Sequence, residues 1–187
     1  GTGALIAGVG LALLFAGGAR WWHLGVWIPP AVGLAAYAIV SAPYRLQRLL
    51  MFLDPWADPQ GSSYHIVQSM TAIANGGLLG SGLGNSTLKF GYLPEDKTDF
   101  IFAIICEELG VPGAALIIGL YVALIWVGVA VVRRCEDRFS RLVGLGIIMT
   151  IGLQAAMNIA VVTVVVPPKG IALPLVSAGG TGWVVTA

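Results

Sequence analysis

Asp99 is the residue in this chain whose type and position are best suited to chemistry. It follows Pro94 and Thr98 and stands directly before the apolar run Phe100–Ile105. Charged side chains at membrane depth cost several kcal/mol, so they are rare there and usually functional. Apolar surroundings raise the proton affinity of a carboxylate, which suits it to act as a general base. The structural alternative makes Thr98 a helix cap and Asp99 a first-turn acid that favours the helix dipole.

Two further acids, Glu107 and Glu108, follow Asp99 two turns later. At about 100° per residue, Glu108 falls on the helix face opposite Asp99, so one helix does not carry a paired-carboxylate site. The sequence instead predicts that both glutamates cap or brace the helix break at 110–113. The preceding glycine-rich stretch, 76–85, has neither the dinucleotide-binding nor the Walker spacing, and this predicts a tight backbone turn.

Lys169 stands in a Pro-Pro-Lys-Gly turn and is a candidate for binding phosphate. A lysine beside exposed backbone amides can hold such an anion, while snorkelling to lipid headgroups is the alternative. The residues alone leave both open. In the apolar run before this turn, small and polar residues recur every four positions and form a polar stripe on one helix face. Residues of this kind join membrane helices. The members of the stripe are Gly146, Thr150, Gln154 and Asn158. No second Cys or His follows Cys106 or Cys135 at metal-ligand spacing, so neither cysteine is predicted to bind a metal.

The elements that position these residues are predicted to be membrane helices. Hydrophobic residues make up 57% of the 187 residues and charged residues 10%, against about a quarter charged in soluble domains. A net charge of +1 gives no indication of nucleic-acid binding. At about 20 apolar residues per span, the sequence predicts an all-α, polytopic transmembrane bundle with five spans: Thr2–Ala19, Leu24–Ala42, Gly113–Val132, Leu142–Val165 and Ile171–Ala187.

Basic residues set the predicted orientation. Four arginines lie in or beside the short loop 133–141, which the positive-inside rule makes cytoplasmic. The chain then divides into a helical hairpin (1–42), a long extracytoplasmic loop (43–98) and further membrane helices (99–187), with a second extracytoplasmic loop at 166–180. Because the chain lacks an initial Met and stops within an apolar run, we expect it to be a fragment.

The extracytoplasmic loop is predicted to contain an amphipathic helix, Tyr64–Asn75, lying in the plane of the membrane interface. Its expected apolar side and polar side are each defined by helical spacing. The apolar side comprises Ile66, Val67, Met70, Ile73 and Ala74, and the polar side comprises His65, Gln68, Ser69 and Asn75.

Three ordered motifs resemble those of the SEDS family (shape, elongation, division and sporulation), most closely its FtsW branch. They read FLDPWADPQGSSYHIVQS, GLGNSTLKFGYLPEDKTDFIFAIICEELG and PPKGIALPLVSAGG, and the resemblance covers essentially the whole chain. It implies the C-terminal half of a roughly ten-span fold. The family's HTDFIFA motif has Lys97 in place of its His, and its SYGGSS motif has Ala178 in place of its Tyr.

The resemblance implies a peptidoglycan glycosyltransferase that polymerises lipid II on the outer side of the bacterial cytoplasmic membrane. Its implied partners are a class B penicillin-binding protein and other divisome membrane proteins. Asp99 would be the general base. Candidate substrate-binding residues are Arg45, Arg48, Lys97, Lys169 and Ser177. A divalent cation, Mg²⁺ or Mn²⁺, is left open as a cofactor.

Two other classes of function remain open. A lipid II flippase would use Asp99 and the glycine-rich turn to gate a path. Transporters, however, place coupling charges near the bilayer midplane, whereas the charges here gather at the predicted outer face. A non-catalytic divisome scaffold would not need Asp99 at all. We expect the chain to be inactive without its missing half.

Overall fold

The structure is a computed structural model that describes residues 2–19, 22, 25–26, 29–30, 32–33, 52–56, 63–86, 99–167, 170 and 172–177. Four helices are delimited in these ranges: α1 (Thr2–Ala16), α4 (Tyr64–Gly76), α5 (Ile101–Arg133) and α6 (Arg138–Val162). The same ranges contain no strand. The predicted all-α class is therefore confirmed.

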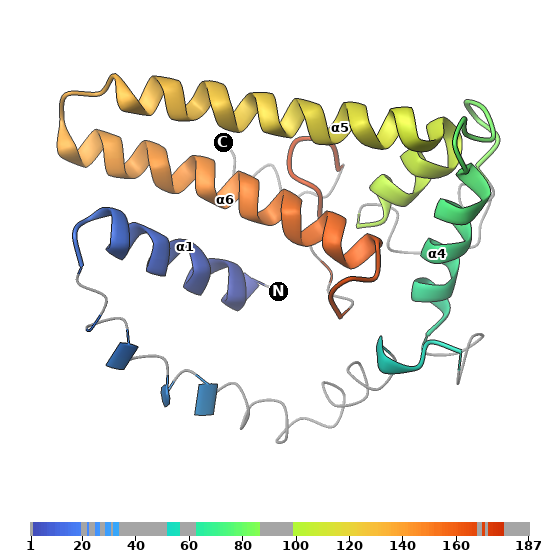
Figure 1. Cartoon of the computed structure of the whole chain (residues 1–187), viewed down its shortest axis with the longest axis horizontal. Coiled ribbons are helices and arrows are strands. Elements are labelled where there is room, and N and C mark those ends of the chain that lie inside the picture. Colours follow the sequence, from blue (N-terminus) through green and yellow to red (C-terminus); the bar gives the residue numbers. More distant parts are fainter. Residues whose placement is uncertain are drawn as a thin grey trace.

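The helices form one layer of long rods with a short helix across one end (Figure 1). Helices α5 and α6 run antiparallel side by side, and α1 packs on α6. Helix α4 crosses the end where α5 begins and α6 finishes, and it contacts both helices. The loop between α5 and α6 lies at the opposite end of the bundle from α4.

Two of the described helices, α5 and α6, are long and apolar enough to span a membrane. They correspond to the predicted third and fourth spans. Helix α1 is shorter than predicted because the chain turns at Gly17 and Gly18, where Gly18 has a φ of 98°. Its 15 residues measure about 22 Å. The predicted second and fifth spans lie largely outside the described residues.

Helix α5 consists of two helical segments that meet at a break. Gly110 has φ 62° and ψ −151°, a backbone conformation that is essentially restricted to glycine. Pro112 follows, and without an N–H it suits the first turn of the second segment. We call residues 101–109 the half-helix and residues 111–133 the long segment. The break was predicted at 110–113.

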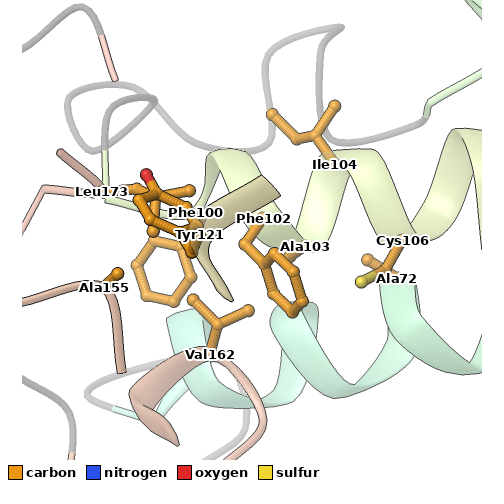
Figure 2. Close-up of a cluster of buried hydrophobic side chains, with 10 residues drawn as sticks. All are labelled: Ala72, Phe100, Phe102, Ala103, Ile104, Cys106, Tyr121, Ala155, Val162 and Leu173. Carbon is orange, nitrogen blue, oxygen red and sulfur yellow. The ribbon is translucent and has the colours of Figure 1, made fainter. Parts of the chain in front are cut away.

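The core lies where the half-helix, α4 and the end of α6 meet (Figure 2). Phe102 and Ala103 of the half-helix are almost completely buried, as are Val162 of α6 and Ala72 of α4. Leu173 enters this cluster from the segment after α6 and is also fully buried. Apolar packing therefore concentrates at the end of the bundle where Asp99 lies.

Helix α4 confirms the predicted helix at 64–75, and the residues that it buries within the protein follow the predicted sides only in part. Its buried residues are Ile66, Ser69, Ala72 and Gly76, whereas Met70 is 38% exposed. The reason is close contact between backbones, since a Cβ added at Gly76 would lie 2.0 Å from the Cys106 carbonyl oxygen. Small residues permit that approach, and the Ser69 hydroxyl donates to the Val162 carbonyl at 2.7 Å.

Candidate active site

Asp99 is half-buried in the turn that leads into the half-helix. The Asn158 side-chain amide of α6 donates to the Asp99 carbonyl oxygen at 2.8 Å. Phe100, the next residue, is buried in the core. The backbone at Asp99 is thus fixed from both sides, by a hydrogen bond from α6 and by the anchored ring of Phe100.

The Asp99 carboxylate lies against the backbone of Gly170. A Cβ added at Gly170 would be 2.9 Å from Asp99 Oδ2, closer than real Cβ contacts. This glycine belongs to the Pro-Pro-Lys-Gly turn, so the structure brings two motifs together that are 71 positions apart (170 − 99) in the sequence. Gly170 leaves room beside the carboxylate that any larger residue would fill.

The segment after Gly170 turns into the bundle without forming a helix, and its carbonyls are satisfied by the neighbouring helices. Gln154 Nε2 donates to the Ala172 carbonyl at 3.0 Å, and the Tyr121 hydroxyl donates to the Pro174 carbonyl. The Ser177 N–H closes a turn onto the Leu173 carbonyl at 2.9 Å. Irregular backbone at membrane depth requires such internal partners. These bonds hold the segment that carries Gly170.

The polar stripe of α6 contacts a second helix at Gly146, whereas Thr150 bonds within α6. A Cβ on Gly146 would contact the Leu13 side chain of α1, and Thr150 bonds back to the Gly146 carbonyl. Gln154 and Asn158 do more than the sequence indicated, because they hold the two segments that meet at Asp99. Tyr121 was missed entirely, although a lone phenol in the apolar run of the long segment is a signal that could have identified it.

The glycine-rich stretch forms the predicted tight turn and covers the break in α5. Gly77, Gly80, Gly82 and Gly84 all have positive φ. The N–H and hydroxyl of Ser81 donate to the Glu107 carbonyl at 2.9 and 2.8 Å, and the Gly82 N–H donates to the Glu108 carbonyl at 3.1 Å. The turn therefore supplies hydrogen-bond donors to the carbonyls of Glu107 and Glu108, which lie at the end of the half-helix just before the break at Gly110.

The two glutamates brace this region, as predicted, and part of the bracing comes from their main chains. Glu107 is 1% exposed, and its carboxylate accepts a 2.5 Å hydrogen bond from the buried Ser86 hydroxyl. Glu108 is also buried. Neither has been brought beside Gly170 as Asp99 has, so Asp99 is the acid that the described structure places in the candidate site.

His65 lies next to the site although the sequence gave it no role. Its ring stacks on Phe100 with centroids 6.1 Å apart and an interplanar angle of 18°. Its Nδ1 is buried and has no hydrogen-bond partner among the described residues. The stacking helps to fix the residue that follows Asp99.

The remaining predicted site residues are mostly not described. Arg45, Arg48, Lys97 and Lys169 lie outside the described residues, and Ser177 is buried beside the turn at Leu173. Their substrate contacts stay predictions. Within the described ranges, no three His, Cys, Asp or Glu side chains come together as a metal site.

The whole chain, residues 1–187, matches the family model for FtsW, RodA and SpoVE, described as cell cycle protein. The chain belongs to this family. It is 44% identical over 186 residues to the stage V sporulation protein E of Bacillus subtilis, covering 97% of this chain and 50% of that protein. It is 46% identical over 182 residues to a probable peptidoglycan glycosyltransferase FtsW of Nitrosococcus halophilus, covering 94% of this chain and 46% of that protein.

The fold is also similar to a solved chain from a peptidoglycan synthase complex that coordinates polymerization and crosslinking. The TM-score is 0.74 at 27% sequence identity, over 98% of this chain and 51% of that one. The chain thus spans about half the length of the relatives it matches. Family membership and the apolar helices identify it as part of a membrane protein.

Proposed function

We propose that the protein containing this chain is a peptidoglycan glycosyltransferase that polymerises lipid II. The observation that carries this proposal is the placement of the Asp99 carboxylate against Gly170, with its main chain held by Asn158. A fixed, half-buried carboxylate at the end of a membrane bundle suits a reaction on a lipid-linked sugar. Relatives named as probable peptidoglycan glycosyltransferases support the same reaction class.

Asp99 acts in this proposal as the general base. Its carboxylate takes the proton from the acceptor sugar hydroxyl while that oxygen attacks the anomeric carbon of the donor sugar. The bond between the anomeric carbon and the diphosphate oxygen breaks, and the polyprenyl diphosphate leaves with the electron pair. A positioned base contributes about 10²–10⁴-fold to such a step.

Cations stabilise the leaving diphosphate. Lys169 is adjacent in sequence to Gly170, whose backbone touches the Asp99 carboxylate, so it is our first candidate for diphosphate contact. Arg45, Arg48 and Lys97 are further candidates, and Ser177 is a candidate polar contact. A divalent cation, Mg²⁺ or Mn²⁺, would neutralise the same charge, and the described residues supply no cluster to hold one.

The site faces the extracytoplasmic side of the bacterial cytoplasmic membrane in this proposal. It lies at the end of the bundle opposite the loop between α5 and α6 (Figure 1), where Arg133, Arg134, Arg138 and Arg141 gather. The positive-inside rule makes the arginine end cytoplasmic. We further propose a class B penicillin-binding protein as partner, supported by the likeness to a chain of a synthase complex, and other divisome proteins as neighbours.

The test uses the complete protein that carries this chain, reconstituted with its partner in liposomes and supplied with labelled lipid II. We expect Asp99→Asn to slow glycan chain growth at least 100-fold, since a base contributes roughly that much. Glu136→Gln is the matched control, because Glu136 is an exposed acid in the α5–α6 loop at the opposite end of the bundle (Figure 1), and it should polymerise normally.

The same preparation distinguishes the other classes of function. If both wild type and Asp99→Asn move lipid II across the bilayer and neither makes glycan, the protein is a flippase. If Asp99→Asn polymerises as fast as wild type, Asp99 is not the base and the catalytic proposal is wrong.

A further inference from the structure

The glycine-rich turn presents three leucines outward on a single charge-free stretch. Leu78, Leu79 and Leu83 are 78%, 88% and 78% exposed, and the stretch 76–86 contains no charged residue. We call these three side chains the leucine loop. Contiguous exposed apolar side chains in a protein commonly mark a binding surface for a partner or a membrane.

Part of the backbone of this turn is hydrogen-bonded within the protein. The N–H groups of Gly80, Ser81 and Gly82 donate to Gly76, Glu107 and Glu108, respectively, and Asn85 bonds to the carbonyls of Gly82 and Ser81. Backbone groups satisfied within the protein are what a non-helical segment needs in order to contact hydrocarbon. The turn therefore combines several backbone groups that are bonded within the protein with three outward leucines.

The position of the turn is fixed by contacts that only glycine permits. A Cβ added at Gly80 would lie 2.2 Å from the Glu108 carbonyl oxygen, and one at Gly110 would lie 2.5 Å from the Gly80 nitrogen. The leucine loop is thus held against residues 108–110, directly before the start of the long segment at residue 111.

The length of the long segment leads us to place one hydrocarbon boundary at its start. Residues 111–133 measure about 34 Å at 1.5 Å per residue, close to the roughly 30 Å of a bilayer core. Arg133 and Arg134 mark the other boundary. Beside the leucine loop, Leu109 and Val111 are exposed on α5, so the loop continues the apolar surface of the long segment.

We propose that the leucine loop inserts into the hydrocarbon of the leaflet on the Asp99 side of the bilayer. The turn then anchors the end of α4 and the half-helix at a fixed depth, close to the plane in which a lipid-linked substrate would lie. This inference depends on the membrane placement of α5 and not on the reaction proposed for Asp99.

Site-directed spin labelling tests the proposal in the complete protein, reconstituted in liposomes with other accessible cysteines replaced by serine. Labels are placed at Leu79→Cys, at Leu120→Cys on the exposed face of the long segment, and at Glu136→Cys in the α5–α6 loop. Collision rates are measured with oxygen, which concentrates in hydrocarbon, and with a water-soluble nickel chelate.

We expect the Leu79 label to resemble the Leu120 label, with a ratio of oxygen to nickel collisions several-fold above that at Glu136. A ratio equal to that at Glu136 would place the loop in water and overturn the proposal. Shielding from both reagents would also overturn it, because the loop would then be covered by protein, either another part of the polypeptide or a partner. Neither result would depend on whether Asp99 is catalytic.

Discussion

The two parts of α5 are both apolar helices, yet they have opposite surroundings. In the half-helix, Phe102, Ala103 and Glu107 are at most 2% exposed, whereas Leu116 and Leu120 in the long segment are each 60% exposed. The half-helix contains two glutamates, and the long segment has no charged residue before Arg133. A carboxylate is tolerated where protein surrounds it and supplies hydrogen-bond donors, and it is avoided where only lipid is available. The break at Gly110 separates a helix that adjoins the candidate site from a helix that is long and apolar enough to cross a membrane.

The largest difference between the two parts is expected from glycine-to-alanine substitutions. Gly76→Ala forces a methyl group within 2.0 Å of the Cys106 carbonyl in the half-helix, and we expect a loss of about 3 kcal/mol in stability from overpacking. Gly119→Ala in the long segment meets no atom within 4 Å and should raise stability by about 0.5 kcal/mol through helix propensity. Unfolding of the detergent-solubilised protein measures both. Equal effects would mean that the two parts do not differ in packing.

A smaller effect is expected from the buried pair in the half-helix. Glu107→Ala leaves the Ser86 hydroxyl without its carboxylate partner at a site with 0% exposure, at a cost of about 2 kcal/mol. Adding Ser86→Ala to that variant should cost little more, because no donor is then left unpaired. If the losses from the two single variants simply add, the pair does not act as a unit.

Tyr121 is a buried residue of the long segment, and the loss of its hydrogen bond should matter less. Tyr121→Phe keeps the ring and removes the hydroxyl that donates to Pro174, so we expect a loss of about 1 kcal/mol. Trp126→Phe is the control, since Trp126 is 72% exposed, and it should leave the unfolding temperature unchanged. An unchanged unfolding temperature for Tyr121→Phe as well would show that this contact does not hold the 172–177 segment.

The smallest effect is expected at the other end of the bundle. The Ser140 N–H and hydroxyl bond to the Asp137 carboxylate at the start of α6 and lower its pKa. A lowered pKa in the folded state means that the stabilisation is present above the unfolded pKa and disappears as the pH falls through the folded pKa. Asp137→Ala should therefore lower the unfolding temperature slightly at neutral pH and not in strong acid, with Asp137→Asn in between. A loss that persists in acid would contradict this origin.

The sequence predicted the elements of this fold better than the contacts between them. Apolar length and composition were sufficient for α5 and α6, and Gly110 with Pro112 indicated the break. The burial of Ser69, which the sequence placed on the polar side of α4, was not predicted because Ser69 and Gly76 pack by close approach of backbones, which a hydrophobic pattern does not register. The end of α1 was also placed too late, since the glycine pair at 17–18 ends the helix inside an apolar run.

The candidate site shows the same limit. Asp99 stood out because a charge beside an apolar run is costly, and the polar stripe of α6 was recognised from its period of four. The sequence could not show that Asn158 bonds to the Asp99 carbonyl or that Gly170 touches its carboxylate, because these contacts join positions 59 and 71 residues apart (158 − 99 and 170 − 99). Tyr121 and His65 were missed for the same reason, since each contributes through a tertiary contact.

The central claim is that the bundle holds Asp99 in place as a base, and a double-mutant cycle on glycan chain growth tests it most directly. The complete protein is assayed as wild type, Asn158→Ala, Asp99→Asn and the double variant, with folding checked by unfolding temperature. If Asn158 acts through Asp99, Asn158→Ala should slow the wild type about tenfold, the rate equivalent of one hydrogen bond of about 1.4 kcal/mol, and should have almost no effect on Asp99→Asn. Equal losses in both backgrounds would show that Asn158 does not position a catalytic Asp99, and would contradict the account.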